Sequence, residues 1–149
     1  MIIRPAVAGD EAAIRSCAEE AYAGYIAAIG RRPAPMEADY AAQIAKGHVH
    51  VALDGKGQLA GFITFFPQGD AMLLENVAVR KAAAGQGIGK ALIGFCEQTA
   101  RRLGLGSVRL YTNAKMVENL AIYPRLGYAE AGRRTEDGFD RVFFEKRLR

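Results

Sequence analysis

The sequence predicts one mixed α/β (α+β) domain with a central, twisted, mostly antiparallel sheet of about seven strands, flanked by about four helices. Two observations predict this fold. Segments with the period of strands and segments with the period of helices follow one another in the order β α α β β β α β α β β. One helix crosses over between two strands, which we therefore expect to be parallel. With 149 residues, the chain has the length of a single domain, residues 1–149.

The first third of the chain is predicted to hold one strand and two helices. Residues 2–5 are a short strand that ends at a proline. A helix follows Asp10, and its apolar residues recur at helical spacing as far as Tyr22 or Tyr25. Two prolines and a glycine then interrupt regular structure between residues 30 and 36, and a second helix is expected at about 37–46.

The rest of the chain begins with three strands. Residues 48–53 and 58–66 are joined by a turn of the hairpin type, and the central strand begins at Ala71 and ends near Arg80. A helix to about Leu103, with Glu97 on its wet side, a strand at 107–112 and a helix at 115–126 come next. The last two strands, 128–135 and 139–148, flank an Asp-Gly turn.

Composition excludes several classes of protein. The net charge is +4, and the arginine pairs are scattered among acidic residues, so we expect no nucleic-acid partner. No window of about 18 apolar residues and no basic leader occurs, so we expect a cytoplasmic protein with no membrane partner. The only two histidines, His48 and His50, lack a third ligand nearby, and we expect no metal site.

A glycine-rich loop between the central strand and the next helix predicts an anion site. Its sequence is Gly85-Gln86-Gly87-Ile88-Gly89-Lys90. Glycines let backbone N–H groups approach a phosphate, and the start of a helix supplies further unpaired N–H groups. The spacing lacks the third glycine of a dinucleotide-binding loop, and Ala91 stands where a P-loop has Ser or Thr.

The loop and a downstream segment together resemble the GNAT superfamily of acetyl-CoA-dependent N-acetyltransferases. The family loop reads Arg/Gln-x-x-Gly-x-Gly/Ala, and here Ala84 stands at the first position, so one side chain is missing while the backbone cradle remains. The second segment, residues 119–128, is similar to the family helix in which a Tyr precedes Leu-Gly-Phe/Tyr. The resemblance implies a GNAT-like fold and acetyl-CoA as cosubstrate.

Acetyl transfer to an amine needs a base for the amine and an acid for the departing thiolate. The resemblance gives the second role to Tyr123, whose alternative is a half-buried aromatic residue with a satisfied hydroxyl. Glu75 is the candidate base, because it interrupts an apolar row formed by Leu73, Val77 and Val79 on one strand face. Its alternative is a structural carboxylate paired with an arginine.

The remaining site predictions also rest on the resemblance. Backbone groups of Val77 and Val79 would pair with the pantetheine arm, with Asn119 beside it. The pyrophosphate would bind the main chain of the loop, at Gln86, Gly87, Gly89 and Lys90.

The acceptor wall would include Tyr25, Arg31 and Met36. We expect an acceptor that is a small-molecule amine, a protein N-terminus or a lysine. Because no cysteine lies in the two motifs, the transfer is expected to be direct, in a ternary complex. The final strands offer an edge at which two copies could form a homodimer. The alternative is a catalytically silent CoA-binding sensor or interaction module.

Overall fold

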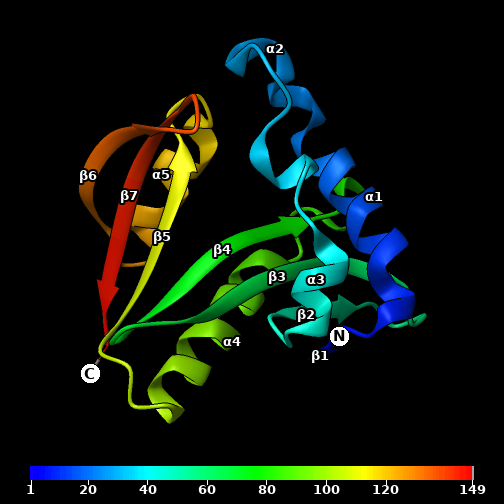
Figure 1. The fold of residues 1–149 in the computed structure, drawn as a ribbon. Helices are drawn as coiled ribbons and strands as arrows, with labels where there is room; N and C mark the ends of the chain where they lie inside the picture. Colours follow the sequence, from blue (N-terminus) through cyan, green and yellow to red (C-terminus); the bar gives the residue numbers. More distant parts are fainter. Residues whose placement is uncertain (149) are drawn as a thin grey trace.

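The structure, a computed structural model that describes residues 1–148, contains one seven-stranded sheet (Figure 1). The strands are β1 (Ile2–Pro5), β2 (Val49–Leu53), β3 (Leu59–Gln68), β4 (Ala71–Val79), β5 (Ser107–Asn113), β6 (Ala129–Glu136) and β7 (Phe139–Arg147). Their order across the sheet is β1-β2-β3-β4-β5-β7-β6. The β4–β5 pair is parallel and the other neighbours are antiparallel, which confirms the predicted fold class.

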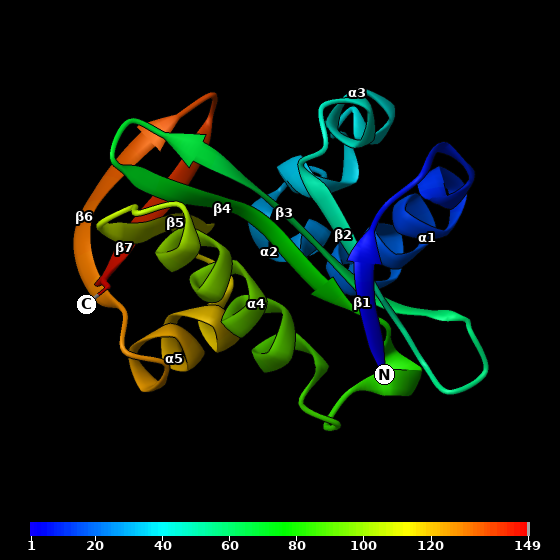
Figure 2. The same ribbon diagram turned by 90° about the horizontal axis from the view of Figure 1, so that it is seen from below.

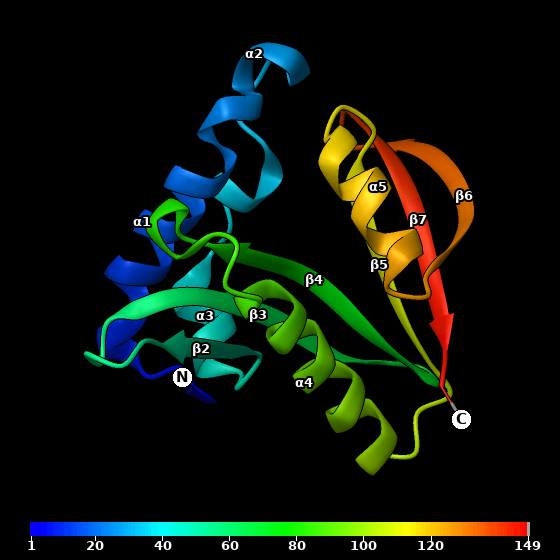
Figure 3. The ribbon, with the colours of Figure 1, turned by 180° about the vertical axis from the view of Figure 1, so that it is seen from behind.

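Helices cover both faces of this sheet. They are α1 (Glu11–Tyr22), α2 (Ile26–Ile29), α3 (Tyr40–Ala45), α4 (Ile88–Arg102) and α5 (Val117–Arg125). Figures 2 and 3 show α4 and α5 on one face and the first three helices on the other. The helix predicted to run as far as Tyr25 is interrupted, because a 3-10 turn at Ala23–Tyr25 separates α1 from α2. No helix among the described residues is long and apolar enough to cross a bilayer.

Each face of the sheet has its own hydrophobic core. Leu92 and Cys96 of α4 and Tyr123 of α5 pack with β4, β5 and β7 in one cluster. Ile14 and Cys17 of α1 pack with the first strands in the other cluster. The sheet therefore separates two cores, and a cleft that opens between β4 and β5 is bordered by both.

Glu97 corrects the prediction for α4, where it was placed on the wet side. Its side chain is buried: the carboxylate accepts a hydrogen bond from the Tyr128 hydroxyl at 2.9 Å and one from Lys146 Nζ at 3.0 Å. Burial of a charge is tolerated because these two donors, one of them cationic, satisfy both oxygens. The donors come from around β6 and β7, so helix periodicity alone could not reveal them.

Candidate active site

The cleft exists because β4 and β5 stop pairing halfway along their length. Their parallel pairing joins Ala71–Leu74 to Ser107–Leu110 and stops there. Beyond that point β4 continues beside β3 as far as Val79, and β5 continues beside β7 as far as Asn113. Each strand is held by its other neighbour, so the two diverge in a V that Figures 1 and 3 show from opposite sides.

The divergence leaves backbone groups of β4 without a strand partner. Arg80 N–H donates to the Ala60 carbonyl of β3 at 2.8 Å. In an antiparallel pair these bonds alternate, so the peptide groups of Val77 and Val79 point away from β3 and toward the opening. The edge of β4 at Val77 and Val79 is therefore without a strand partner; the resemblance implies that a pantetheine arm would pair here.

A β-bulge in β4 changes which side chains face the cleft. Glu75 has no partner in the β3–β4 register. As a result Leu74 and, three positions later, Val77 both pack toward the α4 side, where strict alternation would have placed Val77 with Leu73. The prediction of one unbroken face through Leu73, Glu75, Val77 and Val79 is therefore wrong. The extra residue is what brings Glu75 to the mouth of the V.

The cleft encloses about 790 Å³ of empty space, part of it open to solvent. Its lining comes from both sheet halves and from the segment before α3. The lining residues are Tyr22, Pro33, Ala34, Pro35, Ala38, Gln43, Leu74, Glu75, Asn76, Val77, Leu110, Tyr111, Thr112, Asn113, Met116, Asn119, Tyr123, Phe139 and Arg141. The structure thus brings Glu75, Val77, Asn119 and Tyr123 to one cavity.

Tyr123 lies on α5 with its ring held and its hydroxyl free. The ring is buried, packing edge-on against Tyr128 at 5.8 Å and tilted against Phe144 at 5.8 Å. No hydrogen bond joins its hydroxyl to any residue of 1–148, and it is not among the fully buried atoms that lack a partner, so it opens on the cleft. Burial raises the pKa of the Tyr123 phenol to about 12, which keeps it protonated at neutral pH.

The Glu75 carboxylate forms neither an ion pair nor a hydrogen bond with the described part of the chain. The arginine partner that its structural alternative required is therefore missing from residues 1–148. Burial raises the pKa of Tyr111; among the charges nearby, Arg141 lowers this pKa and Glu75 raises it. Glu75 is thus a cleft-lining carboxylate whose oxygens accept no hydrogen bond from the described residues.

Three side chains form a hydrogen-bonded chain behind β4. The Tyr22 hydroxyl lies 2.5 Å from Asn76 Oδ1 and 2.9 Å from the Val77 carbonyl, and Asn76 Nδ2 donates to the Tyr40 oxygen at 2.9 Å. Tyr40 in turn donates to the Pro35 carbonyl at 2.5 Å. The single Tyr22 hydroxyl proton is shared between Asn76 Oδ1 and the Val77 carbonyl, and the Val77 N–H, which points away from β3, is the donor that faces the opening.

Asn119 stands one turn before Tyr123 on α5. Its Nδ2 donates to Thr112 Oγ1 at 3.1 Å and approaches Met116 Sδ at 3.7 Å. These contacts hold the amide against β5; Asn119 lines the cleft, and its carbonyl oxygen accepts from no described residue. Asn119 is thus placed to accept a hydrogen bond from a ligand N–H group.

The glycine loop follows β4 and ends at the first residue of α4. Gly85 and Gly87 have φ of 80° and 77°, and Gly87 is the N-cap residue. Only glycine adopts this left-handed region without strain, which explains both positions. The amides of Gly85, Gln86 and Gly87 donate to no described group, and the first N–H groups of α4 add to them. Val79 lies against Gly89, so the free strand edge leads to this loop.

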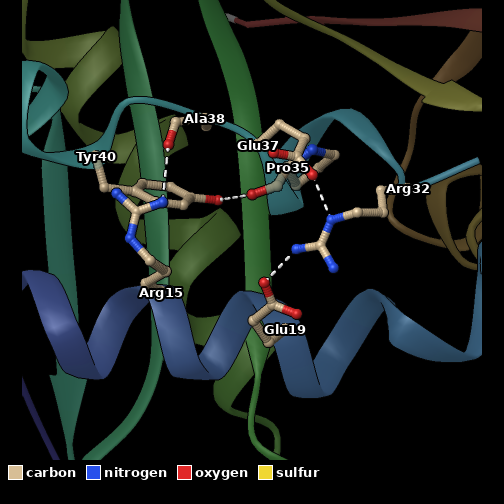
Figure 4. Close-up of polar contacts among 7 residues, drawn as sticks. All are labelled: Arg15, Glu19, Arg32, Pro35, Glu37, Ala38 and Tyr40. Carbon is tan, nitrogen blue, oxygen red and sulfur yellow. Dashed lines mark hydrogen bonds and ion pairs between the residues drawn. The ribbon is translucent and has the colours of Figure 1, made fainter.

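Charged contacts fix the segment that forms the opposite wall (Figure 4). Arg32 contacts both Glu19 on α1 and Glu37 ahead of α3. Arg15 donates to the Ala38 carbonyl at 3.3 Å. These exposed pairs are individually weak, but together they tie the segment to α1 at several points.

The three residues predicted for the acceptor wall have different positions. Tyr25 bonds Glu118 of α5 across the mouth of the cleft. Arg31 lies over the ring of Phe139 at 4.2 Å and donates to a carbonyl of the β6–β7 turn at 3.2 Å. Met36 is buried in the α1-side core. Tyr25 and Arg31 thus stand at the rim and Met36 behind the wall, while 33–35 supply the lining.

Sequence reasoning missed two lining residues with evident chemistry. Asn76 is a polar residue inside the buried run of β4. A polar residue in an apolar strand is a sequence signal for a functional site, but this signal was applied only to the neighbouring Glu75. Arg141 alternates with apolar residues along β7 as any surface residue would, so no local pattern marks it. Its role emerges only when β7 is seen to border the V.

Comparisons with known proteins agree with this geometry. The model of the acetyltransferase (GNAT) family matches residues 14–128, more than half of the chain. No curated protein matches the chain significantly.

Two solved structures match over nearly the whole chain, and a third matches over about two thirds of it. The PaiA N-acetyltransferase of Thermoplasma acidophilum, in complex with coenzyme A, aligns with a TM-score of 0.82 and 19% identity over 99% of this chain and 98% of that one. The ribosomal-protein-S18-alanine N-acetyltransferase of Escherichia coli aligns with a TM-score of 0.77 and 22% sequence identity. This match covers 98% of this chain and 92% of that one. Nourseothricin acetyltransferase aligns with a TM-score of 0.62 and 26% sequence identity, and the match spans 66% of this chain and 64% of that one. The matched family model, the V between β4 and β5 and the glycine loop establish that this chain belongs to the GNAT acetyltransferase family and is an acyltransferase.

Proposed function

We propose that this protein transfers an acetyl group from acetyl-CoA to a primary amine by direct transfer in a ternary complex. One observation carries the proposal: the unpaired edge of β4 leads from the glycine loop to a cleft where the free hydroxyl of Tyr123 and the unpaired carboxylate of Glu75 are both exposed. A thioester tail and an amine can meet there from opposite ends. Structures of family neighbours that hold CoA or acetyl-CoA support the choice of donor.

The donor would bind through backbone groups. The amides of Gln86 and Gly87, with those at Gly89 and Lys90, would receive the pyrophosphate at the positive end of α4. The pantetheine arm would then run along Val79 and Val77 toward the V. Because the Val77 N–H points away from β3 and toward the opening, we assign it as the donor to the thioester carbonyl oxygen.

The transfer would proceed in three steps. Glu75, directly or through one water, takes a proton from the ammonium group, and the free amine attacks the thioester carbon to form the C–N bond. The oxyanion that develops faces the Val77 N–H. When the C–S bond breaks, the Tyr123 phenol protonates the departing thiolate, and the amine nitrogen's second proton restores the phenol through solvent. Acetyl amide and CoA–SH are the products.

Release of free thiol with a panel of amines tests the proposal. We expect Tyr123→Phe and Glu75→Gln to lower kcat by about 10²-fold or more while CoA affinity stays the same, because general acid and base groups contribute on that scale. Glu130→Gln is the control, since Glu130 lies exposed on β6 in an ion pair with Arg133. Full activity in both cleft variants would refute the assigned roles.

The same assay separates the enzyme from a silent CoA-binding module. A module would bind CoA in calorimetry yet release no thiol with any amine. We further propose that the enzyme acts in the cytoplasm. The outer edge of β6 could join two copies, and sedimentation would reveal such a homodimer.

A further inference from the structure

On the β7 side, the cleft is lined by a charged side chain to which the proposed reaction assigns no role. Arg141 lies on β7, and its side chain is only 11% exposed. Among the described residues that line the cleft, Arg141 and Glu75 are the only charged ones. Any acceptor that reaches Glu75 therefore shares the cavity with one guanidinium group.

The orientation of this guanidinium group is fixed on several sides. Its central carbon lies 4.3 Å from the ring centre of Tyr111 and 5.8 Å from that of Phe139. Its Nη1 donates to Glu136 at 3.2 Å and lies 3.7 Å from Asp137. Stacking and pairing together hold the group in one plane, which makes it a preorganised binding group.

Both carboxylates contact a single nitrogen and leave one edge of the guanidinium group unused. Neither Nε nor Nη2 of Arg141 donates to any of residues 1–148. Neither is among the sealed polar atoms without a partner, of which His50 Nδ1 is the one found in the described chain. Nε and Nη2 form the fork that binds a carboxylate through two parallel hydrogen bonds. Arg141 therefore keeps a pair of donors, Nε and Nη2, that no described residue uses.

A neighbouring amide adds a donor on the same side. Asn113 is the cross-strand partner of Arg141, and its Oδ1 already accepts from the Lys115 backbone at 2.9 Å. Because the carbonyl oxygen is used, the Asn113 NH₂ group remains for the cavity. Additional donors beside Arg141 suit an anionic group.

The charges inside the cleft also favour an anion beside Arg141. Arg141 carries the one positive charge among the described residues that line the cleft. A polycationic acceptor would place its second ammonium group beside this guanidinium group. An acceptor with one amine and one carboxylate would instead match the two charges of the cleft.

We infer that the acceptor is an amine that also carries a carboxylate, with its ammonium group at Glu75 and its carboxylate on the Nε–Nη2 edge of Arg141. This inference rests on the proposed function and narrows its substrate class to amino acids and related amino carboxylates. Arg141 is then the residue that determines specificity.

Matched pairs of acceptors test the inference. Each amino acid is compared with its own carboxamide, which keeps the amine and the side chain and removes the negative charge. We expect kcat/KM to be at least about tenfold higher for the acid, because a charge-assisted bidentate contact is lost in the amide. Equal values, or higher values for the carboxamides, would overturn the inference.

Variants at two arginines sharpen the comparison. Arg141→Gln should abolish the preference for the acid, because it lowers kcat/KM for the acid at least about tenfold more than kcat/KM for the carboxamide. Arg141→Lys should restore part of the preference. Arg134→Gln is the matched control: Arg134 is the cross-strand partner of Arg141 and also contacts Glu136, but it is 64% exposed and lies outside the cleft. A preference that survives in Arg141→Gln, with the fold intact by circular dichroism, would overturn the assignment.

A binding experiment keeps this inference separate from the proposed function. The protein saturated with CoA is titrated with N-acetyl amino acids and with their carboxamides. We expect the acids to bind at least about tenfold more tightly to the wild-type protein and no more tightly to Arg141→Gln. If no amine releases thiol, the proposed function fails, but this preference still supports the ligand class; its absence refutes the ligand class even in an active enzyme.

Discussion

The two ends of the cleft are formed by different chemical groups, backbone amides at one end and side chains at the other. The region proposed to bind the donor, residues 77–90 (the donor region), presents backbone amides on a free strand edge and a glycine loop. The acceptor region, residues 22–36 with the β6–β7 hairpin, presents side chains that arrive from distant parts of the chain. Backbone chemistry is the same whatever the side chains, whereas a side-chain wall can change residue by residue. The comparison teaches that ligand contacts in the first region depend mainly on the backbone conformation, whereas those in the second depend on which side chains the fold brings together.

The largest expected effect tests whether both regions share one buried scaffold. Tyr22 and Tyr40 lie behind the acceptor region, and Tyr123 and Tyr128 behind the donor region; burial raises the pKa of all four phenols. Because the pKa of each phenol is higher in the folded than in the unfolded protein, the neutral phenol contributes to the free energy of unfolding below about pH 10. This contribution is lost as the pH rises toward the pKa values of the folded protein. We expect the free energy of unfolding to fall by several kcal/mol between about pH 10 and 12.

Urea unfolding followed by circular dichroism at several alkaline pH values would measure this loss. Tyr40→Phe and Tyr128→Phe should each reduce the slope by a similar amount, at most about 1.4 kcal/mol per pH unit, if the two regions bury their tyrosines alike. A slope that only one variant changes would show that one region opens first.

The next effect concerns the support of the donor region. Glu97→Ala should lower the free energy of unfolding by about 2–3 kcal/mol, because the Lys146 ammonium and the Tyr128 hydroxyl lose their buried partner. Thermal and urea unfolding would measure it. Glu145→Ala removes a more exposed partner, that of Arg109, and should cost less than about 1 kcal/mol. Equal losses would mean that the Glu97 network contributes no more than a surface pair.

A third change addresses the donor region directly. Gly87→Val should weaken CoA binding by about 30-fold, since a β-branched residue is strained at φ 77° and the loop amides must shift. Calorimetry with CoA would measure the affinity. Gly94→Ala, within α4 and with open space around it, should leave the affinity unchanged. Unchanged affinity in Gly87→Val would place the diphosphate elsewhere.

The same contrast explains what the sequence could predict. The parallel β4–β5 pair and the glycine loop follow from local signals, such as a crossover helix and glycine spacing, because each is set by a few consecutive residues. Tyr123 was found through a local motif on one helix. These predictions needed no knowledge of how distant segments meet.

The acceptor region could not be predicted in that way. Arg141 reaches the cleft only because β7 lies beside β5. Met36 is buried in the core and does not line the cleft, because the segment before α3 folds onto α1. The bulge at Glu75 depends on the register against β3, which the sequence of β4 alone does not reveal. In each case the deciding partner lies more than a few residues away.

The smallest effect probes the rim of the acceptor region. The Tyr25 hydroxyl bonds the Glu118 carboxylate, linking the turn after α1 to α5 across the cleft mouth. Because the contact is exposed, it contributes less than about 1 kcal/mol, and we expect Tyr25→Phe to raise the acceptor KM about threefold while kcat and CoA affinity stay unchanged. Glu118→Gln should act similarly, and the double variant should be no worse than either single one, since both remove the same contact. Steady-state kinetics would decide: a tenfold loss of kcat in Tyr25→Phe would mean that the rim takes part in the chemistry, and the division between a backbone-built donor region and a side-chain-built acceptor region would no longer hold.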